Sequence, residues 1–153
     1  MPLVPESRVR LTYADLLEFP SDGNRHEILD GVHYVSAAPA TYHQLVSSRL
    51  HGELHVQVVV PGRAHVFSAP TDVELGAHDI VEPDLLLVSL KRAEIIHPSR
   101  IVGAPDLVIE ILSPSTRRID LGKKRERYER CGVGEYWVVD PERRVVDQYH
   151  RVD

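Results

Sequence analysis

The stretch Glu82-Pro-Asp-Leu-Leu-Leu-Val88, together with Pro105-Asp-Leu-Val-Ile-Glu-Ile-Leu112, decides how this chain folds. Each is a short run of Val, Ile and Leu that begins with Pro-Asp, and such runs are typical of buried strands. Asp84 lies at the mouth of the first run, and Glu110 lies deep inside the second. A lone carboxylate in an apolar strand is costly unless a partner, such as a metal ion, neutralises it. The two runs therefore raise the question of a shared site for these acids.

Length and composition indicate one domain, which we place at residues 1–153. No apolar run approaches the length of a membrane span, and the first residues lack the pattern of a signal peptide. Cys131 is the only cysteine, so no internal disulfide can form. We therefore expect a cytoplasmic protein that does not enter a membrane.

The charge is unevenly distributed along the chain. The net charge of −5 argues against a protein that coats nucleic acid nonspecifically. Residues 1–116 hold 8 basic and 15 acidic side chains, whereas residues 117–153 hold 10 basic and 8 acidic. A locally basic element beside acidic strands suits a site that handles both a cation and a polyanion. A charged helix that is simply solvated is the alternative.

The remaining patterns predict an α/β fold with a mixed central β-sheet flanked by helices. Asp30-Gly31 between two apolar runs predicts a hairpin, and Thr41-Tyr-His-Gln44 predicts a capped helix that continues to about residue 59. A second helix is expected from about 120 to 130, and residues 89–104 are expected to form an irregular loop. The strands near 110 and 135 should be parallel through this second helix. The other expected strands are 64–68, 71–75, 84–88 and 145–149.

Two Pro-Asp pairs compete as the partner of Glu110. Asp106 lies on the same strand as Glu110, four residues away, which places the two about 13 Å apart, too far to share one ion. Asp84 comes from another strand, so sheet pairing at about 4.8 Å can bring its carboxylate beside Glu110. Asp84 and Glu110 are therefore the candidate ligands, and their hard oxygens favour Mg²⁺ or Mn²⁺ over zinc.

A lysine for such a site has to come from the following helix. Leu112 stands where metal-dependent nucleases with a Pro-Asp…Glu-x-Lys pattern have lysine. Asp120, Lys124 and Tyr128 follow at four-residue steps and share one helix face. If this face turns toward the strand end, Lys124 can reach a metal-bound water or a phosphate. Lys123 points about 100° away and is expected to be solvated.

Four motifs together resemble the Uma-two family of restriction-endonuclease-like proteins, formerly a domain of unknown function, in the PD-(D/E)XK nuclease superfamily. They are Pro83-Asp84-Leu-Leu-Leu-Val88, Pro105–Thr116, Asp120-x-x-x-Lys124-x-x-x-Tyr128 and Gly132–Pro141. The upstream stretches Glu27–Gly31 and His43-Gln44 also match the family, so the resemblance covers nearly the whole chain. Relatives usually continue past the strand at 145–149, so this chain is either a member shortened at its C-terminus or one from which a piece is missing.

The resemblance implies a role for each matching residue. Asp84 and Glu110 would be metal ligands for Mg²⁺, with Mn²⁺ as the other candidate, and Lys124 would stabilise the transition state. Glu27 and His43 would be outer members of the site. The implied activity is hydrolysis of phosphodiester bonds in DNA, and the implied assembly is a homodimer.

Interpretations in which these residues have only structural or binding roles stay open. His43 falls on the core face of its helix, where a histidine is more often satisfied by a core partner than used in a site. Glu27, just before the Asp-Gly turn, can equally be an exposed strand residue. The whole protein can be a non-catalytic nuclease-fold module that binds nucleic acid or a protein partner. It can also be a structural dimer in which the carboxylates are simply hydrogen-bonded.

Overall fold

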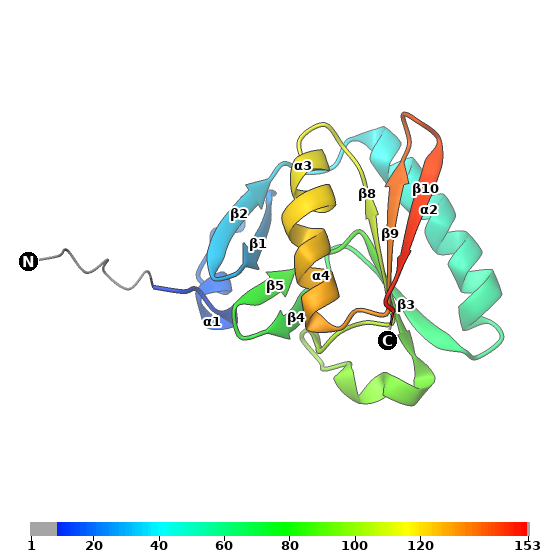
Figure 1. The fold of residues 1–153 in the computed structure, drawn as a ribbon, viewed down its shortest axis with the longest axis horizontal. Coiled ribbons are helices and arrows are strands. Elements are labelled where there is room, and N and C mark those ends of the chain that lie inside the picture. Colours follow the sequence, from blue (N-terminus) through cyan, green and yellow to red (C-terminus); the bar gives the residue numbers. More distant parts are fainter. Residues whose placement is uncertain (1–8, 153) are drawn as a thin grey trace, which may run out of the picture.

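The two apolar runs form neighbouring strands of one sheet. β6 (Leu85–Ser89) pairs antiparallel with β8 (Leu107–Ile111), and β8 pairs parallel with β9 (Glu135–Asp140), as the helical crossover predicted. A computed structural model describes residues 9–152, and Figure 1 shows helices on both sides of this sheet. β3 (Ala64–Ser68) and β10 (Val145–His150) complete its order β10-β9-β8-β6-β3.

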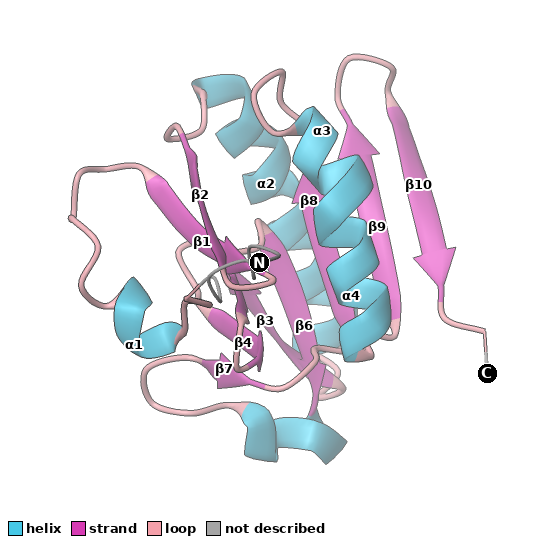
Figure 2. Ribbon diagram, turned by 60° about the vertical axis from the view of Figure 1, so that its left-hand side comes forward, coloured by secondary structure: helices cyan, strands magenta, loops and turns pink. Residues whose placement is uncertain are grey.

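The other strands form a second sheet of order β2-β1-β5-β4-β7 (Figure 2). Its members are β1 (Arg25–Leu29), β2 (Val32–Ser36), β4 (Val73–Gly76), β5 (Asp79–Val81) and β7 (Ile101–Val102). The hairpin of β1 and β2 turns at Asp30 and Gly31, which have φ values of 52° and 75°, as the Asp-Gly pair predicted. The α/β class is therefore confirmed, with the strands divided between two mixed sheets.

Helices cover both faces of the first sheet. α2 (Thr41–Leu54) continues into a wider π-helical turn, η1 (His55–Val59), and packs Val46, Leu50 and Leu54 on one face. The opposite face is covered by a continuous helical segment. It consists of α3 (Arg117–Ile119), the π-helical turn η3 (Asp120–Lys124) and α4 (Arg125–Cys131). Gly132 ends this segment in the left-handed conformation, with φ 90°, which is typical of a helix C-terminal cap.

Two local predictions were wrong. A helix capped by Thr41 would begin at residue 42. The helix instead begins at Thr41, with Ala40 at the N-cap position and no side chain that caps it. Residues 89–104 are not all irregular, since they contain the 3₁₀ helix η2 (Leu90–Ile95) and β7. The short α1 (Tyr13–Leu16) begins with a capping box, in which Asp15 accepts a hydrogen bond from the Thr12 backbone N–H at 2.7 Å. No helix among residues 9–152 is long and apolar enough to cross a membrane.

Strand alternation in β8 decides which side chains face the site. Ile109 and Ile111 pack on the α2 side, whereas Val108 and Leu112 pack on the side of the α3–α4 segment. Glu110 shares the second face, because side chains alternate along a strand. The carboxylate therefore points into the layer between the first sheet, the second sheet and α4.

Candidate active site

Asp84 and Glu110 meet at the end of two paired strands. Leu85 of β6 lies opposite Ile109 of β8, so the antiparallel register places Asp84 across from Glu110. Asp84 also contacts β8 directly, because its Oδ2 accepts a hydrogen bond from the backbone N–H of Ile111 at 2.7 Å. Both acids are buried, with 3% and 1% of their surfaces exposed. The pair predicted from the sequence is thus brought together.

Two basic side chains hold Asp84. Arg25 Nη1 donates to Oδ1 at 3.0 Å, and His43 Nε2 lies 3.2 Å from Oδ2. Burial opposes ionisation of Asp84, but the hydrogen bond from His43 and the charge of Arg25 outweigh it, so the pKa of Asp84 falls to about 2. Burial likewise disfavours the charged form of His43, yet its bond to Asp84 raises the pKa of this imidazole above its usual value.

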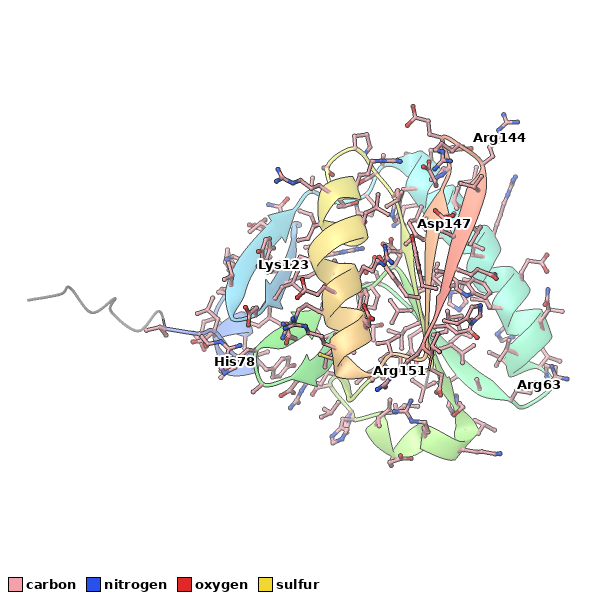
Figure 3. The ribbon with its side chains drawn as sticks, viewed as in Figure 1. Arg63, His78, Lys123, Arg144, Asp147 and Arg151 are labelled. Atoms are coloured by element: carbon pink, nitrogen blue, oxygen red, sulfur yellow. The ribbon has the colours of Figure 1, made fainter. Side chains whose placement is uncertain are left out.

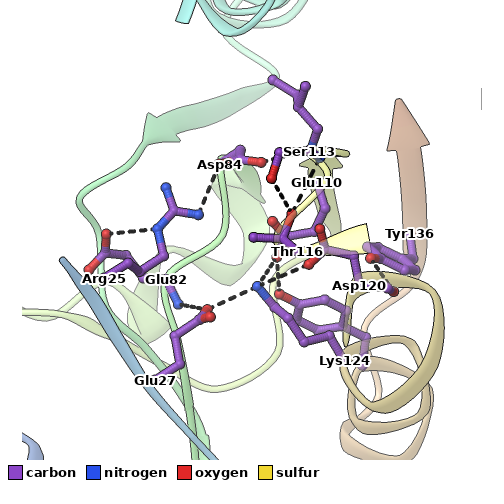
Figure 4. A network of polar contacts seen from close by, with 12 residues as sticks. Arg25, Glu27, Glu82, Asp84, Glu110, Ser113, Thr116, Asp120, Lys124 and Tyr136 are labelled. Atoms are coloured by element: carbon purple, nitrogen blue, oxygen red, sulfur yellow. Dashed lines mark hydrogen bonds and ion pairs between the residues drawn. The ribbon is translucent and has the colours of Figure 1, made fainter. Parts of the chain in front are cut away.

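Glu110 is held by the lysine that the sequence singled out. Lys124 Nζ lies 2.5 Å from Glu110 Oε1 (Figure 4). The Tyr128 hydroxyl donates to the same oxygen at 2.6 Å. Burial raises the pKa of Glu110 well above its usual range, against the charge of Lys124, and the neighbouring Asp120 and Asp84 raise it further. The surroundings of Glu110 therefore favour its neutral form more than water does.

The helix face predicted from four-residue spacing does turn toward the strands. Asp120, Lys124 and Tyr128 are all buried, and Lys124 Nζ lies 3.7 Å from Asp120 Oδ1. Burial raises the pKa of Asp120 to about 6 in spite of Lys124. Lys123 lies apart from this cluster, half-buried, with its ammonium 5.6 Å from the centre of the Tyr34 ring. Figure 3 shows Lys123 on the side of the helical segment that faces the β1–β2 hairpin.

Glu27 belongs to the buried cluster, so the alternative of an exposed strand residue is wrong. It is 4% exposed, and its Oε1 lies 2.9 Å from Lys124 Nζ. The same oxygen accepts a hydrogen bond from the backbone N–H of Glu82 at 2.7 Å. Glu27 thereby ties β1 to both the lysine and the strand end that carries Asp84.

Sequence reasoning missed Arg25 and Glu82. Arg25 Nε lies 3.2 Å from Glu82 Oε1, while its Nη1 binds Asp84 (Figure 4). A signal for both was present, because Arg25 and Glu27, like Glu82 and Asp84, are two residues apart on extended chain and so face one side. What the pattern could not show was that the two strands' charged faces meet.

Asp106 lies outside the site, as strand geometry predicted. Its Oδ2 accepts a hydrogen bond from the Ser89 N–H at 2.7 Å, and its Oδ1 lies 3.4 Å from Arg92 Nη1. It therefore fastens the start of β8 to the end of β6.

His43, unlike Asp106, joins the site. Among the buried side-chain nitrogen and oxygen atoms of residues 9–152, its Nδ1 is the one without a hydrogen-bond partner.

The buried cluster opens into a cavity of about 870 Å³. One wall comes from the loop after β2, residues 36–40, and the facing wall comes from the loop after β8, residues 113–116. Arg118 and Lys123 stand on the same lining. The side chains at its base are Arg25, Glu27, His43, Asp84, Glu110, Asp120 and Lys124. This volume suits a small ligand or one part of a longer chain.

The donor chemistry of the site fits a hard divalent cation with few protein ligands. Asp84 and Glu110 supply carboxylate oxygens from one face, while residues 9–152 contain no group of three or more His, Cys, Asp or Glu placed to hold an ion. Mg²⁺ is commonly held by one or two carboxylates, with waters or phosphate oxygens in its other positions. The cluster also holds more acidic than permanently cationic side chains, since five carboxyl groups face Arg25 and Lys124.

Comparison with known proteins places this geometry in a family. The chain superposes on the crystal structure of a "putative nuclease belonging to DUF820" from Anabaena variabilis with a TM-score of 0.78. The two share 22% sequence identity over 94% of this chain and 81% of that chain, so the likeness shows the fold. A comparison with curated proteins gave no match. The family model named Uma2, described as "Putative restriction endonuclease", matches residues 13–153. This chain therefore belongs to the Uma2 family of restriction-endonuclease-like proteins.

Proposed function

We propose that this protein is a Mg²⁺-dependent endonuclease that hydrolyses phosphodiester bonds in DNA. The observation that carries the proposal is the meeting of Asp84 and Glu110 at the base of one cavity, beside the buried ammonium of Lys124. Family membership and the nuclease-like fold support the reaction class. Mn²⁺ has the same preference for oxygen ligands and is the alternative ion.

In this proposal Asp84 and Glu110 hold the cation. The bound cation would supply a water of lowered pKa and neutralise charge on the phosphate. Lys124 holds its proton at Nζ throughout, and its positive charge stabilises negative charge that develops on the phosphate oxygens. Glu27 and Tyr128 hold Lys124 and Glu110 in place, through contacts of 2.9 Å to the ammonium and 2.6 Å to the carboxylate. His43 orients Asp84 from the first turn of α2.

DNA fits the charge of the cavity rim. Residues 117–130 contain seven basic and three acidic side chains, and one of them, Arg118, lines the opening. Phosphate contacts from such residues give salt-dependent affinity without reading sequence. The homodimer implied by the resemblance remains a prediction, and sedimentation at several protein concentrations tests it.

The deciding experiment compares two adjacent lysines. Lys124→Ala should reduce Mg²⁺-dependent cleavage by about 10²–10³, the usual effect of removing one electrostatic stabiliser. Lys123→Ala is the matched control, because its ammonium contacts the Tyr34 ring and none of the buried carboxylates. Single-stranded, duplex and supercoiled DNA, with RNA for comparison, should be tried with Mg²⁺ and with Mn²⁺. Equal activity of the two variants would remove Lys124 from the mechanism.

A non-catalytic nuclease-fold module is the second candidate. The observation that favours it is the engagement of both acids by internal cations, Asp84 by Arg25 and Glu110 by Lys124. Such a cluster can be a structural feature of the core. Salt-dependent binding of nucleic acid without cleavage of any substrate, in either metal, would establish this reading instead.

A further inference from the structure

Arg25 occupies an unusual position between two carboxylates. Its side chain is 13% exposed and comes from β1, at the base of the large cavity. Nη1 lies 3.0 Å from Asp84 Oδ1, and Nε lies 3.2 Å from Glu82 Oε1. The planar guanidinium can hold two acids at once because its N–H groups point in fixed, divergent directions. Arg25 therefore connects the proposed metal ligand to an acid outside the proposed ligand pair.

The second acid, Glu82, is placed so that it can keep Arg25 bound. Glu82 is two residues before Asp84 and lines a separate cavity of about 400 Å³, which Asp72 also lines. Among residues 9–152, Arg25 is the basic side chain that forms an ion pair with Glu82. Glu82 is thus a second carboxylate partner that can hold Arg25.

A divalent cation and Arg25 would compete for Asp84. The second oxygen, Oδ2, is already engaged by the Ile111 N–H and by His43, so Arg25 holds the remaining oxygen, Oδ1. A cation that approaches Oδ1 meets the charge of the guanidinium at short range, where repulsion is strong in a buried site. The guanidinium need not leave the cluster to relieve this repulsion, because its Nε–H contact to Glu82 does not involve Asp84.

We propose that Arg25 is the counter-ion of Asp84 in the metal-free protein, and that it remains bound to Glu82 alone once a divalent cation binds. The inference rests on the proposed function, since it takes Asp84 as a metal ligand. Arg25 then sets the affinity of the site for its cation, and Glu82 is a positioning residue that receives the displaced guanidinium. The pair holds the two acids in place before the ion arrives.

The test is calorimetric titration of Mn²⁺ and Mg²⁺ into the whole protein without nucleic acid. Arg25→Gln should raise the affinity about tenfold, which corresponds to a coupling free energy of about 1.4 kcal/mol. Glu82→Gln should lower it by a similar factor, because Arg25 then has only Asp84 as its partner. Two controls make the same change of charge without touching Arg25. Lys123→Gln and Asp72→Asn should each change the affinity less than about twofold.

The outcomes separate this inference from the proposed function. If the wild-type protein binds neither ion, the metal site itself is absent and the proposed function fails first. If the wild-type protein binds and Arg25→Gln binds equally or more weakly, Arg25 does not compete and this inference alone is overturned. If circular dichroism shows that Arg25→Gln is unfolded, the test is the comparison of the metal affinities of Glu82→Gln and Asp72→Asn. Equal affinities of those two variants would overturn the inference.

Discussion

Replacing Lys124 by methionine removes the ammonium that Glu27, Glu110 and Asp120 share, while keeping most of the side chain's volume. The Nζ atom lies 2.9, 2.5 and 3.7 Å from these three acids, and the lysine is 2% exposed. Removing one partner from a buried ion pair costs about 3–5 kcal/mol, because the other charge stays buried without compensation. We therefore expect Lys124→Met to lower the free energy of unfolding by at least about 3 kcal/mol at pH 8.

The loss should depend on pH in a defined direction. Without Lys124 the buried carboxylates have pKa values raised above the value of about 4.3 for glutamate in an unfolded chain. The folded variant then keeps protons that the unfolded chain has released, so its stability falls as pH rises from about 5 toward the raised pKa. Each retained proton contributes a slope of about 1.4 kcal/mol per pH unit. The difference from the wild type should thus be smallest near pH 5.

Urea unfolding at pH 5.5, 7 and 8.5, followed by circular dichroism, measures this difference directly. Lys123→Met is the matched control, and its effect should stay within about 0.5 kcal/mol because it lies outside the buried cluster. A loss below about 1 kcal/mol at pH 8.5, or one that does not change with pH, would refute the reasoning. The carboxylates would then be accessible to water or counter-ions once the lysine is gone.

Three further predictions concern the ligand pair, the tyrosine and the hairpin. Asp84→Asn should abolish Mn²⁺ binding in calorimetry, whereas Asp106→Asn should leave it intact, and equal losses would show that the strand register is misassigned. Tyr128→Phe should lower the free energy of unfolding by about 1.5–3 kcal/mol, because it deletes a buried hydrogen bond to a carboxyl group. Gly31→Ala should be more destabilising than Gly23→Ala by at least about 1 kcal/mol in thermal unfolding. Both glycines have positive φ, but a Cβ at Gly31 would lie 2.6 Å from the Arg10 Cβ and one at Gly23 would meet open space.

The sequence by itself determined the local secondary structure and which side chains share a face of β8 and of the following helix. Apolar runs of strand length fixed β6 and β8, and strand alternation fixed that Glu110 and Leu112 share a face. The four-residue spacing of Asp120, Lys124 and Tyr128 determined that their side chains lie on one helix face. These features follow from the repeat of an isolated strand or helix, so they can be read from neighbouring residues alone.

Only the tertiary structure decided which of these faces meet. The division of the strands into two sheets brought β1 beside β5, and so placed Arg25 against Asp84, 59 residues away in sequence. Strand order depends on the packing of the whole core, in which many pairings satisfy the same local patterns. The role of Glu82 was hidden for the same reason. Its side chain acquires a meaning only when the guanidinium of another strand lies beside it.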